Sequence, residues 1–140
     1  MEIQQKVLVT AIIIYEGKIL MQKRTDRHPD FFEKWTTPSG IVEINEHPQA
    51  AVIREIKEEL NIDIEVLSVI PAIDSFPDHH HKYHLVYLAY LCKYISGEMA
   101  NVDEDGDISE ARWVPLAELK DLPLIRGTMP PIKMALSQNR

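Results

Sequence analysis

The sequence predicts a domain of the α/β class, of either the α+β or the mixed α/β type. Three observations predict it: most segments are short, apolar and β-branched, one segment in mid-chain has helical periodicity, and two further helical segments close the chain. A length of 140 residues suits one domain with a substantial core. Because no internal repeat or linker is visible, we expect residues 1–140 to form a single domain.

The N-terminal part of the chain has the pattern of a β-hairpin. Residues 7–14 are aliphatic and β-branched, and residues 19–24 return as a second strand after a turn that contains Gly17. Residues 25–34 are polar and include Pro29, so we expect a loop there.

A helix is predicted over residues 48–60. Pro48 suits a first helical turn, and His47, which precedes a proline, is biased away from helical angles. Ala51 lies on the acidic face of this helix, where its small side chain leaves room for a ligand. The expected apolar stripe consists of Ile53, Ile56 and Leu60, and the expected acidic face of Glu55, Glu58 and Glu59.

The second half of the chain alternates strand and loop patterns before it closes with helices. Isoleucine and valine alternate with acids directly after the helix, which is typical of a strand. The remaining elements are expected as strands at 62–66, 83–95 and 111–114, an acidic loop at 97–107, and helices at 115–120 and 128–137.

Three carboxylates on one helix face repel one another, and a hard divalent cation would relieve that repulsion. Such an ion can bind phosphate oxygens and activate water. Arg54 lies four residues before Glu58, so a bidentate pair between them would orient the carboxylate. Gly40, which has no side chain, lets the backbone approach a metal closely. The alternative is a solvated acidic helix with ordinary salt bridges.

The spacing of these residues resembles the Nudix box, G-x5-E-x7-R-E-U-x-E-E-x-G-U, in which U is a bulky aliphatic residue. Asn61 replaces the last glycine of the pattern, and every other fixed position matches. The matching fixed positions are Gly40, Glu46, Arg54, Glu55, Ile56, Glu58, Glu59 and Ile62, and Trp35, Pro38 and the segment 113–116 also fall where the family has them. The resemblance covers most of the chain and implies a mixed β-sheet between helices, with the box as a loop–helix–loop motif.

The resemblance also implies roles for individual residues. Glu55 and Glu59 would bind metal directly, Glu58 would bind metal or activate water, and the Ser39 carbonyl would complete a metal shell. Arg54 would orient the carboxylates, with Glu46 as a supporting acid. Arg24 and Gly40 would lie against the substrate, Arg24 at its phosphates. One further loop acid is expected, and the candidates are Glu104, Asp107 and Glu110.

The implied function is that of a MutT-like Nudix hydrolase, a Mg²⁺-dependent pyrophosphohydrolase in which Mn²⁺ can substitute. Its substrate would be a nucleoside diphosphate linked to another group, and Pro77 stands where the family's ADP-ribose hydrolases have a proline. One alternative is hydrolysis of nucleoside triphosphates to monophosphates. Another is a non-catalytic sensor of a nucleotide or of ADP-ribose, which would not need the full set of box residues.

Composition narrows the range of partners. A net charge of −7 without a basic run argues against nucleic-acid binding. The apolar run at residues 7–15 is too short to span a bilayer and lacks the form of a signal peptide, and Cys92 alone cannot form an internal disulfide. We therefore expect a cytoplasmic protein with a small-molecule nucleotide substrate and no membrane, and a homodimer is left open.

Two other features each have a structural and a functional interpretation. His79, His80, His81 and His84 form a cluster that could bind a transition metal, although a polar loop that runs into a strand is the preferred interpretation. Cys92 lies in an apolar strand, which favours a buried packing role over a nucleophile.

Overall fold

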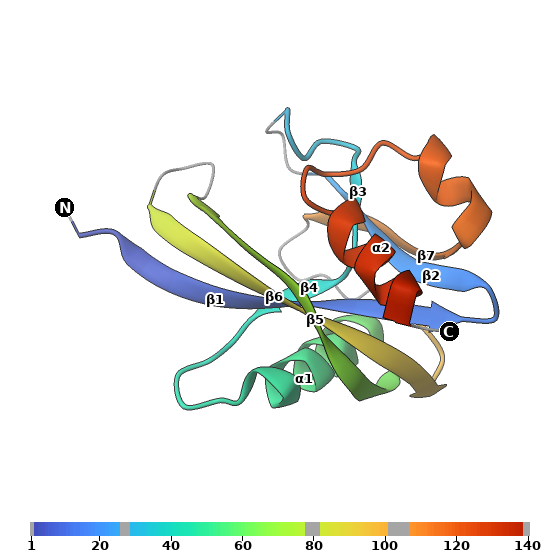
Figure 1. Cartoon of the computed structure of the whole chain (residues 1–140), viewed down its shortest axis with the longest axis horizontal. Coiled ribbons are helices and arrows are strands. Elements are labelled where there is room, and N and C mark those ends of the chain that lie inside the picture. The colour runs from blue at the N-terminus through green and yellow to red at the C-terminus, as the bar shows by residue number, and fades with distance from the viewer. Residues whose placement is uncertain (1, 26–28, 78–81, 101–106, 139–140) are drawn as a thin grey trace.

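The computed structural model describes residues 2–25, 29–77, 82–100 and 107–138. A mixed β-sheet of seven strands dominates these residues, with helices on both of its faces (Figure 1). The strands are β1 (Gln4–Tyr15), β2 (Lys18–Arg24), β3 (Trp35–Thr36), β4 (Ser39–Ile41), β5 (Asp63–Pro77), β6 (Tyr83–Ser96) and β7 (Ile108–Pro115). The helices are α1 (Pro48–Leu60), a 3₁₀ helix (Leu116–Asp121) and α2 (Met129–Gln138).

Strand β1 organises the sheet. It runs parallel to β6 from Gln4 opposite Tyr83 to Ile13 opposite Cys92, and antiparallel to β2 and β4. The strand order is β3-β2-β1-β6-β5, with β4 on β1 and β7 on β2. The short strand β4 therefore places Ser39 directly beside the middle of β1.

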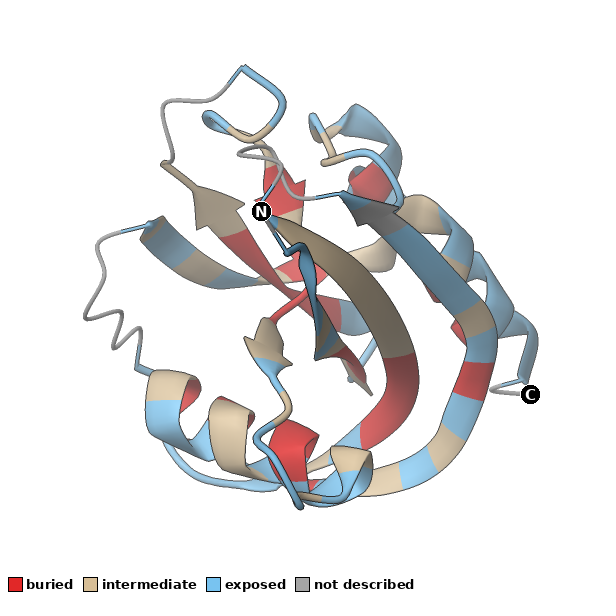
Figure 2. Ribbon diagram, turned by 90° about the vertical axis from the view of Figure 1, so that its left-hand side faces the viewer, coloured by how far each residue is buried: buried red, intermediate tan, exposed pale blue. Residues whose placement is uncertain are grey.

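Two apolar clusters hold the helices against the sheet. One lies under α1, where Val52, Ile56 and Leu60 pack with residues of β1 such as Val9 and Ala11. The other lies under α2 and contains Ile132, Ala135 and residues of β1, β2 and β6. A sheet between helices confirms the predicted fold class, and Figure 2 shows buried residues on the central strands and on the inner side of α1.

The buried stripe of α1 differs from the predicted one. Ile53 is 41% exposed, whereas Val52 is only 1% exposed and packs in the core with Ile56 and Leu60. A stripe spaced i, i+4, i+8 lies on the helix side next to the sheet, and Ile53 is turned one position away from it. Ala51 is fully buried in the same cluster, so the prediction that it leaves room for a ligand is wrong.

Strand β5 is longer than predicted and continues to Pro77. Its register shifts between Val66 and Ser68 and again between Ile70 and Asp74. These irregularities interrupt the alternation of apolar and polar residues, and Pro71 lies within the second of them. Proline is tolerated at bulges and on edge strands such as β5, so the strand passes a residue that normally marks an end.

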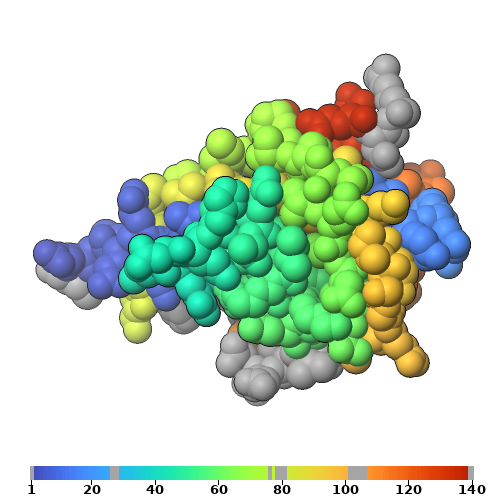
Figure 3. Space-filling model, turned by 90° about the horizontal axis from the view of Figure 1, so that it is seen from below, coloured from blue at the N-terminus to red at the C-terminus, as the bar shows by residue number. Residues whose placement is uncertain are grey.

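Helix α1 and the loop before it form much of the surface in Figure 3, beside the projecting N-terminal part of β1. No helix within the described ranges is both long and apolar enough to cross a lipid bilayer.

Candidate functional site

Helix α1 carries most of the predicted site residues, and both of its ends are capped. At the N-terminus Pro48 occupies the first turn, and His47 Nδ1 accepts a hydrogen bond from the Gln49 N–H at 3.1 Å. At the C-terminus Asn61 is left-handed, with φ 59° and ψ 27°, and its N–H donates to the Lys57 carbonyl. The asparagine thus takes the backbone conformation predicted for the glycine that it replaces.

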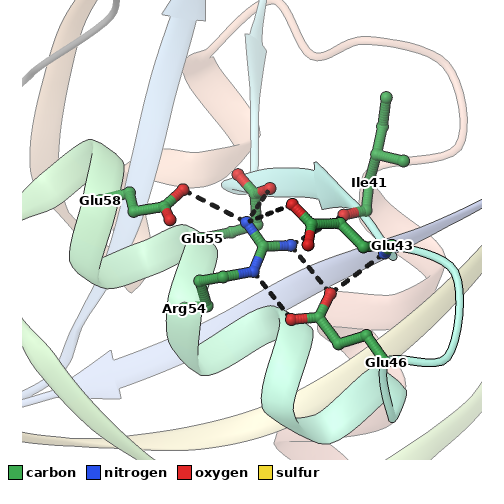
Figure 4. A network of polar contacts seen from close by, with 6 residues as sticks. All are labelled: Ile41, Glu43, Glu46, Arg54, Glu55 and Glu58. Carbon is green, nitrogen blue, oxygen red and sulfur yellow. Dashed lines mark hydrogen bonds and ion pairs between the residues drawn. The ribbon is translucent and has the colours of Figure 1, made fainter.

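Arg54 is the centre of an ion network on the outer side of α1 (Figure 4). Its Nε and Nη2 atoms donate to the two carboxylate oxygens of Glu46 at 2.8 and 2.9 Å. Nη1 donates to Glu55 at 2.9 Å and to Glu58 at 3.2 Å, and Nη2 also donates to the Ile41 carbonyl at 3.1 Å. The predicted bidentate pair of Arg54 with Glu58 is therefore wrong, and the bidentate partner is Glu46. Glu58 is 59% exposed and accepts from only one guanidinium nitrogen.

This network fixes the charges of its members. The hydrogen bonds from Arg54 lower the pKa of Glu46 to about 2, with help from the backbone N–H of Glu43. The carboxylates of Glu46 and Glu55 in turn raise the pKa of Arg54. Both members of the main pair therefore stay ionised at neutral pH.

Gly40 allows Glu55 to lie close to strand β4. A Cβ atom at position 40 would overlap the Glu55 side chain and would stand 2.6 Å from its Oε2 atom. Any larger residue at this position would displace the Glu55 carboxylate. The absence of a side chain thus makes room for an acid of the helix.

A second, neutral network supports the same short strand from the side of β1. The Thr10 and Thr37 hydroxyl oxygens are 2.6 Å apart, and the Thr10 hydroxyl donates to the Pro38 carbonyl at 3.1 Å. Ser39 Oγ contacts Thr10 Oγ1 and the Thr37 carbonyl, both at 3.2 Å. The backbone N–H of Ala11 also donates to Pro38, so the turn before Gly40 is held at several points.

A pocket of about 120 Å³ opens between α1 and the β2 side of the sheet. It brings together three residues predicted as metal or phosphate ligands and one of the competing loop acids, which are Arg24, Ser39, Glu59 and Asp107. Its other lining residues are Gln22, Thr36, Thr37 and Ile108. Glu59 of α1 and Arg24 of β2 therefore line one cavity.

The three candidate loop acids are separated by the structure. Asp107 lines the pocket, and Glu104 lies outside the described residues. Glu110 is not in a loop, because β7 already begins at Ile108, and it pairs with Lys23 on β2. Side chains alternate along a strand, so Glu110 lies on the face opposite that of Gln22 and is not brought to the pocket.

Of the four predicted metal ligands, Ser39 and Glu59 line the pocket, whereas Glu55 and Glu58 do not. Among the residues that the structure describes, no three histidine, cysteine or acidic side chains converge on one point. Arg54 holds Glu55 and Glu58, whereas Glu59 lines the pocket with Ser39. Carboxylate and carbonyl oxygens are nonetheless the ligands that a hard divalent cation prefers, so the donor set fits such an ion.

The remaining predicted features are the histidine cluster and Cys92, and neither His84 nor Cys92 lines the pocket. His79, His80 and His81 lie outside the described residues, and the His84 ring bonds to Gln5 and Ser75. Cys92 is 1% exposed, and burial raises the pKa of its thiol to about 12. Burial of this cysteine matches its predicted packing role.

Sequence reasoning missed Gln22 of β2 and Thr37, which lies between β3 and β4, as pocket residues, and Thr10 of β1 as a support of the turn at Pro38. A signal was present, because Thr10 and Gln22 are polar positions within or directly after apolar strand segments. A buried polar side chain in a strand needs a partner or a ligand. That pattern identifies candidates even before a pocket is known.

The chain matches the family model of the NUDIX domain over residues 5–134. It is 34% identical over 116 residues to the ADP-ribose pyrophosphatase of Methanocaldococcus jannaschii, which amounts to 83% of this chain and 65% of that enzyme. More generally, the chain spans 34%, 65% and 31% of the lengths of three curated relatives that it matches.

Solved structures share the fold. The crystal structure of a MutT NUDIX hydrolase from Burkholderia pseudomallei is 32% identical, with a TM-score of 0.78 over 94% of this chain and 98% of that chain. The NUDIX domain of Shewanella oneidensis NrtR, solved with ADP ribose, is 20% identical, with a TM-score of 0.74 over 100% of this chain and 91% of that chain. This second likeness shows the fold alone.

Proposed function

The chain belongs to the Nudix family, and on that premise we propose that it is a metal-dependent pyrophosphohydrolase that cleaves a P–O–P bridge in a nucleotide. The observation that carries the proposal is the pocket, in which Glu59 of α1 and Arg24 of β2 line the same cavity as Ser39. Carboxylates that can hold a cation and a guanidinium that can pair with phosphate are the two groups that a diphosphate needs.

The divalent cation, Mg²⁺ or Mn²⁺, would be held by Glu55, Glu58, Glu59 and the Ser39 carbonyl. When bound, it supplies polarisation of phosphate oxygens and a lower pKa for bound water. Arg54 donates hydrogen bonds to Glu55 and Glu58 and so fixes the orientation of both carboxylates, which is a positioning role.

The reaction we propose is attack by water on one phosphorus. A bond forms from the water oxygen to phosphorus, and the bond from that phosphorus to the bridging oxygen breaks, so that the electron pair leaves with the released phosphate. The water proton passes to a carboxylate. We assign this acceptor to Glu58 or Asp107, because Asp107 lines the pocket and Glu110 does not.

The substrate class we favour is a nucleoside diphosphate linked to a second group, such as ADP-ribose. The similarity to an ADP-ribose pyrophosphatase supports this choice. Pro77 ends β5 at the position that prompted the same expectation from the sequence.

A substrate panel tests the proposal. ADP-ribose, nucleotide sugars, dinucleoside polyphosphates and nucleoside triphosphates are incubated with Mg²⁺ or Mn²⁺, and the products are identified. AMP and ribose phosphate from ADP-ribose support the favoured class, whereas pyrophosphate release from triphosphates supports the nucleotide-pool alternative. Tight binding of ADP-ribose without turnover of any substrate would instead indicate a sensor.

Matched variants test the residues. Glu59→Gln should lose most turnover and should respond less to added metal, whereas Glu65→Gln, an exposed acid on β5, should behave as the wild type. Asp107→Asn and Glu110→Gln separate the two remaining loop acids, because only Asp107 lines the pocket. Equal turnover in the Asp107 and wild-type proteins would leave Glu58 as the proton acceptor.

A further inference from the structure

Gln22 is an unusual residue for the centre of a sheet. It lies on β2 between β3 and β7, opposite Thr36 on one side and Ala111 on the other. Only 3% of the residue is exposed, and it directly follows the fully buried residues Leu20 and Met21. Its long polar side chain therefore stands where the strand would otherwise continue an apolar core.

The side chain of Gln22 forms no hydrogen bond with any residue that the structure describes. Among these residues, no side-chain nitrogen or oxygen is sealed from solvent without a hydrogen bond. The small exposed fraction of Gln22 must therefore include its amide. Because Gln22 lines the pocket, that amide opens onto the cavity.

An almost buried amide without a partner among the described residues must complete its hydrogen bonds with whatever fills the cavity, which is water in the free protein and a ligand in a complex. A leucine at this position would suit the neighbouring core better. The amide is thus explained by a ligand that occupies the cavity and supplies the missing partner.

We propose that the Gln22 amide donates a hydrogen bond to a phosphoryl oxygen of a bound diphosphate. This inference rests on the proposed function, and it adds a substrate contact that the sequence pattern did not indicate. Gln22 lines the pocket together with Ser39 and Glu59 at the proposed metal side and Arg24 two residues further along the same strand. Side chains two positions apart on a strand share a face, so Gln22 and Arg24 can contact neighbouring phosphates.

The neutrality of the amide fits this place. A second cation in the cavity beside Arg24 would add to the repulsion of a divalent cation at Glu59. An amide N–H contributes a hydrogen bond to an anionic oxygen without that repulsion. The geometry therefore assigns charge pairing to Arg24 and the metal, and neutral donation to Gln22.

Calorimetry with ADP and with inorganic pyrophosphate, each in the presence of Mg²⁺, tests the proposal in the intact chain. Gln22→Leu should weaken the binding of both probes by about tenfold, the usual effect of losing one hydrogen bond to a charged group. Gln22→Glu, which keeps the size but replaces the donor by an anion, should weaken binding at least as much. Weakened ADP binding with unchanged pyrophosphate binding would overturn the assignment to phosphate, and wild-type affinity in the Gln22→Glu protein would overturn the donor role.

Thermal unfolding without ligand supplies an independent measurement. Gln22→Leu should melt at the wild-type temperature or above it, because the substitution removes no hydrogen bond to the residues that the structure describes. The matched control is Thr128→Val, a buried residue outside the pocket lining whose hydroxyl does have a partner, Thr36 Oγ1 at 3.3 Å. It should melt lower and bind the probes normally. A fall in melting temperature for Gln22→Leu as large as that of the control would show a structural amide and overturn the proposal.

These outcomes also separate this proposal from the proposed function. If the wild type binds and hydrolyses a diphosphate and Gln22→Leu does so with the same KM, only the role of Gln22 is lost. If the wild type neither binds the probes nor hydrolyses any substrate of the panel, both proposals fail together.

Discussion

Two hydrogen-bond networks brace the same short segment, residues 37–41, and they do so with opposite chemistry. From the side of α1, the charged guanidinium of Arg54 binds three carboxylates and the Ile41 carbonyl. From the side of β1, the neutral hydroxyls of Thr10, Thr37 and Ser39 bind one another and the Pro38 carbonyl. One network is partly open to solvent, with Arg54 at 24% exposure, whereas Thr10 and Thr37 are 7% and 4% exposed.

The two networks should respond differently to ligands, salt and pH. The charged network includes one carboxylate oxygen each of Glu55 and Glu58, so a cation that binds these acids would share their carboxylates with Arg54. The hydroxyl network carries no charge and sits away from solvent, so salt and pH leave it nearly unchanged. The segment thus has one support that responds to ligands and one that stays fixed.

The largest effect is expected from removal of the charged centre. Arg54→Met deletes every bond of the network and leaves Glu46, Glu55 and Glu58 to repel one another. We expect a loss of about 2 kcal/mol in the free energy of unfolding, and the greatest loss of turnover among these variants. Urea denaturation and a turnover assay measure the two effects.

Arg54→Lys is the control for this change, because it keeps the charge and loses the planar fork. It should recover part of the stability and less of the turnover, since bidentate binding of Glu46 needs the guanidinium. Wild-type stability in the Met variant would show that the network contributes nothing measurable.

The neutral network should respond to Thr10→Val with a loss of about 1–2 kcal/mol, because the buried Thr37 hydroxyl and Pro38 carbonyl lose a partner. Urea denaturation at low and high salt measures this loss, which should be the same in both. Thr10→Ser, which keeps the hydroxyl, should restore most of the loss. A strongly salt-dependent loss would contradict the neutral character of this network.

Acid should weaken the charged network selectively. The pKa of Glu46 is about 2 in the folded protein and 4.5 without its partners, so its contribution to stability is present above about pH 4.5. That contribution is lost as the pH falls through the folded pKa. The stability difference between wild type and Glu46→Gln should therefore be largest near neutral pH and should shrink from pH 4.5 towards pH 2.

Glu43→Gln is the matched control for the acid series. The Glu43 side chain is 70% exposed and its carboxylate stays 3.9 Å from Arg54, so its removal should change stability little at any pH. A constant difference between wild type and Glu46→Gln across the whole range would mean that Glu46 titrates alike in the folded and unfolded chains.

The charged half of this comparison could be predicted from the sequence, because its residues lie close together in the chain. Helical spacing alone placed Glu55, Glu58 and Glu59 on one face, and the motif added Arg54 and Glu46. The choice of Glu46 as the bidentate partner depends on how the loop between β4 and α1 folds back, which no helical spacing encodes.

The neutral half could not be predicted because its residues come from distant parts of the chain. Thr10 and Thr37 meet only through the pairing of β4 with β1, and Gln22 meets Glu59 only through the way the sheet and α1 enclose the pocket. Local patterns identify which positions are polar in an apolar strand, but long-range pairing decides what such positions contact. The same limit explains the misplacement of Glu110, whose strand partner is on β2.

The smallest effect is expected at the far end of α1, where neither network reaches. Asn61 combines a left-handed backbone with a side-chain bond from its Nδ2 atom to the Glu98 carbonyl at 3.2 Å. If the backbone conformation alone keeps the glutamates in register, Asn61→Gly should change turnover by no more than a few-fold and leave stability nearly unchanged, since glycine enters this region freely. Turnover and urea denaturation provide the measurement.

Asn61→Val tests the effect of backbone strain at the same position. A β-branched residue at φ 59° is strained, and we expect a loss of about 1–2 kcal/mol in stability. Because the valine also lacks the bond to Glu98, the glycine variant serves as its control: both lose the side-chain contact, and only valine strains the backbone. A glycine variant as unstable as the valine variant would transfer the role from the backbone to the amide of Asn61. The end of α1 would then depend on a contact with the 97–100 segment and not on the left-handed turn itself.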